Sequence, residues 1–214
     1  LPPSVSLDLA REIVKKVREA KRPVINAGNG IRIGKAFDVF QRVVEMLGIP
    51  VVTGWNSLDC MYDSHPLYVG RAGHMGDRPG NFAVQNCDLL LSLGSRLSIR
   101  QVGYNYPTWA REAYVIYNDI DAEELKKPTV HVDMPVHADV KDLLEKMEMV
   151  LEVEAVSADG GPKDKEAVDW WISRCQQWKE KYPVVLPKHY EAGEDQPANI
   201  YAAIKEISRR AEED

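Results

Sequence analysis

Long hydrophobic runs are absent from this 214-residue sequence. No apolar stretch approaches the roughly 20 residues that a membrane-spanning helix needs. The N-terminal stretch also lacks the basic start and apolar middle of a signal peptide. Positive charge is not in excess, because 27 Lys and Arg residues are interspersed with 33 Asp and Glu residues. Nucleic acids and anionic membranes attract a concentrated basic face. We therefore expect neither as a partner, and we expect a cytoplasmic protein.

Cysteine is scarce as well. The three cysteines, Cys60, Cys87 and Cys175, are far apart and odd in number, which excludes a disulfide framework and a CxxC metal pattern. No Ser-His-Asp, Cys-His or HExxH grouping is present, so no catalytic residue and no metal ligand is predicted. The residues that could carry chemistry instead indicate a binding cleft.

Short apolar segments alternate with helical patterns along the chain. The segments are rich in Leu or β-branched residues with little alternation, which is typical of strands covered on both faces of a parallel sheet. This order predicts the α/β class: a three-layer, Rossmann-like domain with a six-stranded parallel sheet and right-handed crossovers. The predicted strands are residues 23–27, 49–53, 67–70, 88–94, 113–119 and 129–135. The predicted helices are residues 7–20, 35–47, 139–151, 165–181 and 197–212.

The composition becomes polar, with Gly and Pro, at residues 154–167, which predicts a linker after a domain of residues 1–153. Residues 168–214 form the predicted C-terminal helical extension, whose two helices cannot enclose a core alone. The extension carries an aromatic cluster that includes Trp170 and Trp171. Base stacking is one interpretation, but without basic residues beside the cluster, packing at a domain boundary is favoured.

Loops that leave the carboxyl ends of parallel strands meet at one edge of the sheet, where ligands bind. Gly28 and Gly30 follow the first predicted strand. Glycines there let backbone amides approach a phosphate, aided by the N-terminus of the following helix. The third glycine of GxGxxG is missing, since Ile33 stands in its place. A purely structural turn is therefore an equal alternative.

Later loops supply polar side chains to the same edge. Arg96 and Arg100 follow the fourth strand and suit phosphate oxygens, although surface ion pairing is the alternative. After the fifth strand, we expect Asp119 to accept ribose hydroxyls and Asp121 to cap the following helix. His74 lies in a Gly-rich loop where its ring could stack on a ligand or donate to it.

Two further histidines occur beside carboxylates. His131 and His137 lie two residues before Asp133 and Asp139. These pairs are too few for a metal site, so satisfied polar contacts are the favoured interpretation.

Taken together, "RPVINAGNGIR", "LGIPVVTGWNSLD", "GRAGHMGDRPGNFAVQNCDLLLSLGSR" and "YNDIDAEELKK" resemble, in order, the central domain of thiamine-diphosphate-dependent enzymes of the acetolactate synthase group. The resemblance covers about residues 1–151, and the remainder is similar to the linker and first helix of the family's C-terminal domain. Two motifs depart from the family. Its Gly-Met-His-Gly loop reads Gly-His-Met-Gly at residues 73–76, and its Gly-Ala-Arg-Phe-Asp-Asp-Arg segment reads "GSRLSIR", which keeps both arginines.

The resemblance implies a longer parent enzyme with three α/β domains per chain. The first and third domains would bind thiamine diphosphate and Mg²⁺ across a homo-oligomeric interface, and the central domain would hold FAD, ADP or nothing. The parent would decarboxylate and join 2-oxo acids in branched-chain amino acid biosynthesis. The family's catalytic glutamate belongs to the first domain and its metal-binding element to the third, so we expect this chain alone to be inactive, with the parent's N- and C-terminal domains as its partners.

The resemblance also implies a cofactor-binding cleft. Its expected lining is Gly28, Asn29, Gly30, Thr53, Trp55, Asn56, Gly73, His74, Gly94, Arg96, Arg100, Asn118, Asp119 and Asp139. Two other functions stay open. One is a stand-alone dinucleotide-binding module related to electron-transfer flavoproteins or transhydrogenases. The other is an inert scaffold, as in thiamine-diphosphate-dependent decarboxylases.

Overall fold

The computed structural model describes residues 2–155, 161–191, 193 and 197–211. The chain divides into two compact units, Leu1–Lys179 and Glu180–Asp214, which are treated separately. Within the described ranges, no helix is both long enough and apolar enough to cross a membrane.

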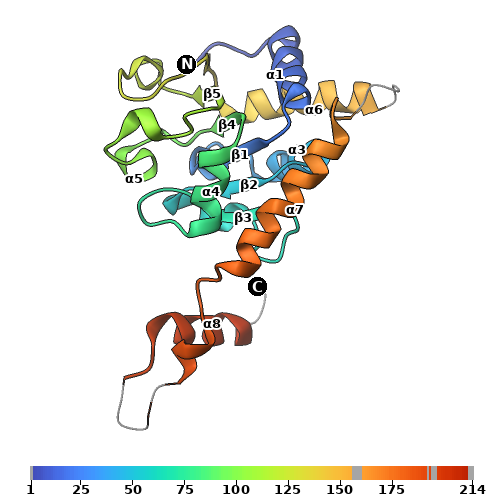
Figure 1. The fold of residues 1–214 in the computed structure, drawn as a ribbon. Helices are drawn as coiled ribbons and strands as arrows, with labels where there is room; N and C mark the ends of the chain where they lie inside the picture. The colour runs from blue at the N-terminus through green and yellow to red at the C-terminus, as the bar shows by residue number, and fades with distance from the viewer. Residues whose placement is uncertain (1, 156–160, 192, 194–196, 212–214) are drawn as a thin grey trace. The chain divides into compact units, whose positions relative to one another are not determined.

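The first unit is built around a six-stranded sheet in which every neighbouring pair is parallel. The strand order is β3-β2-β1-β4-β5-β6, which confirms the predicted Rossmann-like architecture (Figure 1). The direction of winding reverses between β1 and β4, so the topological switch point lies there. The strands are β1 (Pro23–Ala27), β2 (Val51–Thr53), β3 (Tyr68–Arg71), β4 (Leu89–Leu93), β5 (Tyr114–Asp119) and β6 (Met134–His137).

Helices cover both faces of this sheet. The α-helices of the first unit are α1 (Leu7–Glu19), α2 (Gly30–Ile33), α3 (Phe37–Leu47), α4 (Arg78–Asn86), α5 (Ile99–Val102), α6 (Val140–Ala155) and α7 (Lys165–Lys181). Its 3₁₀ helices are η1 (Trp55–Cys60), η2 (Tyr106–Thr108) and η3 (Glu124–Lys126).

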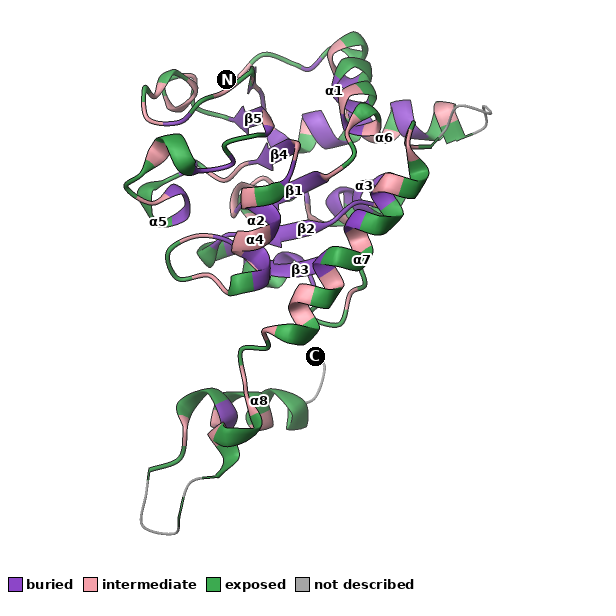
Figure 2. Cartoon of the chain, in the orientation of Figure 1, coloured by how far each residue is buried: buried purple, intermediate pink, exposed green. Residues whose placement is uncertain are grey.

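Strand side chains alternate between two apolar cores. Ile25 and Leu91 join the core formed with α1, α3 and α6, whereas Val24 and Leu90 join the core formed with α4, α5 and α7. The central strands are therefore buried along their whole length (Figure 2). Burial on both faces explains why these strands read as continuous apolar runs in the sequence.

Several elements differ from the prediction: helix α5 was not predicted, and α6 continues to Ala155, beyond the predicted end at residue 151. Helix α4 was not predicted, because its Arg-Pro-Gly start reads as a loop, yet the Asp77 carboxylate caps it by accepting a hydrogen bond from Gly80 N at 2.9 Å. Strand β6 begins later than predicted, since residues 128–130 form a turn. The chain first bonds to β5 where Asp133 N donates to Val115 O at 3.0 Å. Apolar alternation just before this point was mistaken for the strand itself.

Within the first unit, helix α7 packs on the sheet through Trp171. Its side chain is only 1% exposed, and its indole Nε1 donates to Pro23 O at 3.1 Å. This burial agrees with packing as the role of the aromatic cluster. The bounds of α7 match the predicted helix, whereas residues 156–160 of the predicted linker lie outside the described residues. The division into domains stays a prediction.

The second unit contains η4 (Pro187–Tyr190) and α8 (Ile200–Arg210) among its described residues. Asn199 caps α8, since its Oδ1 accepts a hydrogen bond from Tyr201 N at 3.0 Å. Helix α8 begins and ends close to the predicted helix of residues 197–212.

Candidate functional site

A cleft of about 760 Å³ lies at the carboxyl edge of the sheet, around the switch point. Loops that follow β1, β2, β3, β4 and β5 all contribute to its wall, together with the residues just after β6. The volume is within the range of cofactor sites. Parallel strands thus bring together segments that lie far apart in the sequence.

Most of the predicted site residues line this cleft. They are Gly28, Asn29, Gly30, Trp55, Asn56, Gly94, Arg96, Arg100, Asn118, Asp119 and Asp139.

The other predicted residues, Thr53, Gly73 and His74, do not line the cleft. Thr53 is fully buried, and its hydroxyl shares a hydrogen bond of 3.0 Å with the hydroxyl of Tyr68. His74 is exposed, and its backbone N donates to Arg100 O at 2.7 Å. Gly73 and His74 therefore support the wall at Arg100, whereas Ala72, Met75 and Gly76 of the same loop line the cleft.

The glycine turn after β1 is occupied by contacts within the protein. Gly28 N donates to Leu93 O and Gly30 N donates to Gly94 O, both at 2.9 Å. A Cβ atom at Gly28 would lie 2.2 Å from Ser95 Cα. The glycines thus allow the β1 and β4 loops to touch, and neither of their amides is left for a phosphate. Helix α2, which follows the turn, has only four residues.

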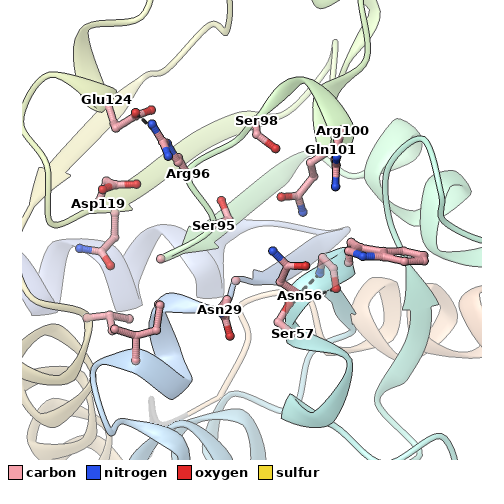
Figure 3. Close-up of a pocket in the computed structure, with 18 of the residues that line it drawn as sticks. Asn29, Asn56, Ser57, Ser95, Arg96, Ser98, Arg100, Gln101, Asp119 and Glu124 are labelled. Carbon is pink, nitrogen blue, oxygen red and sulfur yellow. Dashed lines mark hydrogen bonds and ion pairs between the residues drawn. The ribbon is translucent and has the colours of Figure 1, made fainter.

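Three arginines reach the cleft, and they differ in their partners. Arg71 Nε lies 3.3 Å from Asp77 Oδ2, and Arg96 Nε lies 2.9 Å from Glu124 Oε1 (Figure 3). The hydrogen bond to Glu124 raises the pKa of the Arg96 guanidinium. The Arg100 side chain has no ion pair or hydrogen bond within the described part of the chain. Arg100 is therefore the arginine best placed to bind an external anion.

The loop after β5 supplies carboxylates. Asp119 is buried, and its oxygens accept hydrogen bonds from Tyr117 Oη at 2.9 Å and Asp121 N at 3.0 Å. Burial and the nearby Asp119 raise the pKa of Tyr117, which keeps the phenol protonated as a donor. Asp121 Oδ1 accepts a hydrogen bond from Glu123 N at 2.9 Å. The predicted capping role of Asp121 is nevertheless wrong, because Glu123 is the N-cap residue of η3 and no side chain caps this helix.

Asn118 presents a buried oxygen without a partner. Its Nδ2 donates to Ala138 O at 2.9 Å and to Val136 O at 3.2 Å. Its Oδ1 has no hydrogen-bond partner within the described part of the chain, although Asn118 is only 1% exposed and lines the cleft. Buried polar atoms are rarely left unpaired. A hydroxyl or amino group of a ligand would satisfy this oxygen.

Sequence reasoning missed several residues of the wall, including Arg71, Ser98, Gln101 and Glu124. Gln101 and Ser95 both line the cleft, and both come from the segment that follows β4 (Figure 3). One signal was present in the sequence, namely an asparagine inside the otherwise apolar first strand. Such a buried amide requires polar partners from elsewhere in the fold.

The remaining histidines make local contacts. His131 Nε2 lies 2.9 Å from Asp133 Oδ1, and His137 Nε2 lies 3.1 Å from Ile120 O. No group of three or more His, Cys, Asp or Glu side chains is arranged for a metal ion in the ranges that the structure covers.

Comparison with known proteins adds family information. The model of the thiamine pyrophosphate enzyme central domain matches residues 10–147. A probable acetolactate synthase large subunit of Methanococcus aeolicus is 33% identical over 169 residues, which are 79% of this chain and 28% of that protein. The acetolactate synthase of Mycobacterium avium is 36% identical over 161 residues, 75% of this chain and 25% of that protein.

The acetolactate synthase large subunit of Lactococcus lactis subsp. lactis is 35% identical over 173 residues, or 81% of this chain and 28% of that protein. The chain thus spans between 25% and 28% of the length of these three curated relatives.

Proposed function

Because this chain belongs to the thiamine pyrophosphate enzyme family, whose central domain matches residues 10–147, we propose that its cleft binds a nucleotide of the FAD or ADP type. We propose further that the chain serves in an acetolactate synthase-like enzyme that decarboxylates and joins 2-oxo acids, as the names of its relatives suggest. Its own role is structural and ligand-binding.

The observation that carries the nucleotide proposal is that the cleft offers one group for an anion and another for a hydrogen-bond donor. Arg100 offers an unpaired guanidinium for phosphate oxygens, while Asn118 offers a buried, unpaired oxygen to a hydroxyl or amino donor. Asp119, beside Asn118, can accept from ribose hydroxyls. A ligand that combines an anion with such donors fits this wall, and FAD and ADP both do. FAD would also bring a flavin ring, whereas ADP has no redox-active group.

The rest of the proposed enzyme lies outside this cleft. We assign thiamine diphosphate and Mg²⁺ to the parent's N- and C-terminal domains, which are the proposed partners of this chain in a cytoplasmic homo-oligomer of branched-chain amino acid biosynthesis. The chain alone, supplied with pyruvate, thiamine diphosphate and Mg²⁺, is expected to form no acetolactate.

An inert scaffold is the second candidate, and a specific observation favours it. The amides of Gly28 and Gly30, which a phosphate-binding turn would use, already donate to backbone carbonyls. On this reading the cleft is retained for packing against other domains.

Ligand analysis distinguishes the two candidates. The purified chain is denatured and its small molecules are identified by mass spectrometry, and the ligand-free chain is then titrated with FAD and with ADP by calorimetry. We expect saturable binding of at least one nucleotide, with riboflavin as the control that lacks phosphate and adenine. If neither nucleotide binds and none accompanies the protein, the scaffold replaces the nucleotide proposal.

A further inference from the structure

A polar side chain lies in the middle of the central strand. Asn26 in β1 is fully buried between β2 and β4, where its neighbours in register are Val52 and Ser92. Burying an amide is unfavourable unless its donors and acceptor are bonded. The Asn26 amide is bonded on both sides, so it belongs to a network.

The network leads from the strand to two residues that line the cleft, both in the segment after β4. Asn26 Nδ2 donates to Ser92 Oγ at 2.9 Å, and Ser92 Oγ lies 2.7 Å from the hydroxyl of Ser95. On the other side, Gln101 Nε2 donates to Asn26 Oδ1. Ser95 and Gln101 both line the cleft, so one buried amide ties its β4 loop to α5.

Helix α5 has only four residues and depends on such anchors. From outside, His74 N donates to Arg100 O at 2.7 Å, and Gly73 lies so close that a Cβ atom there would be 2.6 Å from the same oxygen. From below, Asn26 holds Gln101, the residue next to Arg100. The backbone at Arg100 and Gln101 is thus held by two contacts, and among the three arginines that line the cleft only Arg100 has no side-chain partner within the described residues.

We propose that Asn26 is a positioning residue: through Gln101 it holds α5 so that Arg100 faces the cleft, ready for the phosphate of a bound nucleotide. The ligand part of this inference rests on the proposed function, whereas the positioning part does not. Pre-organised side chains lose less conformational freedom when a ligand binds. The buried network therefore strengthens the binding of anionic ligands through the position of Arg100, and Asn26 itself makes no contact with the ligand.

The test uses three variants of the full chain. Asn26→Leu removes both hydrogen bonds of the Asn26 side chain at similar volume. If Asn26→Leu fails to fold, Gln101→Met removes the hydrogen bond between Gln101 and Asn26 alone. Tyr68→Phe is the matched control, because it removes a buried hydrogen bond of 3.0 Å to Thr53 that has no link to α5. Hydrogen exchange reports the amides of Val102 and Gly103, which close α5, and calorimetry reports ADP and adenosine binding.

We expect faster exchange of the α5 amides and roughly twofold to tenfold weaker ADP binding in both network variants, the loss that one neutral hydrogen bond predicts. In Asn26→Leu, adenosine affinity should not change, because adenosine has no phosphate for Arg100 and Asn26 does not line the cleft. Tyr68→Phe should alter neither readout. Unchanged exchange in α5 would overturn the positioning role. If the network variants lose affinity for ADP and adenosine equally, Asn26 does not act through the contact of Arg100 with phosphate. If wild type binds neither compound, the link to the anion fails, the FAD titration still decides the proposed function, and exchange still decides the role of Asn26.

Discussion

At the scale of single residues, Arg96 and Arg100 have the same chemistry but different surroundings. Arg96 lies 2.9 Å from Glu124, and its backbone O accepts a hydrogen bond from Lys127 Nζ. It also has a φ of 58°, a left-handed conformation that is uncommon outside glycine. The Arg100 side chain has no ion pair or hydrogen bond among the residues that the structure describes, and only its backbone O accepts one, from His74 N. A ligand would have to break an existing ion pair to use Arg96, but it could bind Arg100 directly.

We therefore predict that Arg100→Ala weakens ADP binding by about 1.5–3 kcal/mol, the usual contribution of a hydrogen bond to a charged group. Arg96→Ala is the matched variant and should weaken binding less, because its guanidinium already belongs to Glu124. Calorimetric titration of the two variants and wild type measures the difference. A larger loss in Arg96→Ala would show that the ligand displaces Glu124.

At the scale of elements, α7 is attached to the sheet mainly through one face. Trp171 is 1% exposed, whereas its neighbour Trp170 is 58% exposed. The Trp171 ring also meets the Trp178 ring edge to face, with centroids 5.7 Å apart. The amphipathic pattern of residues 165–181 predicted this helix, but only its partners in the fold show which tryptophan anchors it.

We predict that Trp171→Ala lowers the free energy of unfolding by about 3–5 kcal/mol, since it leaves a large cavity and an unpaired Pro23 carbonyl. Trp170→Ala, the adjacent control, should cost only about 1 kcal/mol, because it loses little more than its ring contact with Trp171. Urea denaturation followed by circular dichroism measures both values. Similar losses in the two variants would contradict the docking of α7 through Trp171.

At the scale of the whole molecule, burial of thiols and phenols makes the free energy of unfolding depend on pH in the alkaline range. Burial raises the pKa of Cys60 from 9.0 to about 11, of Cys87 from 9.0 to about 12 and of Tyr68 from 10.0 to about 12. Each group stays protonated in the folded chain at a pH where it ionises in the unfolded chain. Their contribution to stability is complete below pH 9.0 and is lost as pH rises through the folded-state values.

We accordingly predict that the urea midpoint falls as pH rises above 9.0 in the presence of a reductant. Cys87→Ala should flatten this decline, since it removes one of the raised pKa values. Burial lowers the pKa of Lys179, which acts with the opposite sign, because its burial cost disappears as pH rises. Lys179→Met should therefore steepen the decline, and a pH-independent midpoint in wild type would contradict the assignment.

Local pattern alone determined most of the architecture. Strands buried on both faces are mostly apolar, so five of the six were located within about two residues, and their alternation with helices specified a parallel sheet. A parallel sheet in turn places its loops at one edge, which is why eleven of the fourteen predicted site residues line a single cleft. The errors at α4 and β6 arose where capping and sheet pairing, which are contacts between residues, override local composition.

Only the tertiary structure decided which polar groups of the cleft are free. The Gly28 amide is taken by Leu93, Arg96 is paired with Glu124, and Asn26 is bonded to Gln101, which lies 75 residues away. No pattern along the chain specifies these partners, because hydrogen bonds and ion pairs depend on which segments meet in space. The sequence therefore determined where a ligand site would form, and the folded packing determined that Arg100 and Asn118 are among the groups of the described residues that are left to bind one.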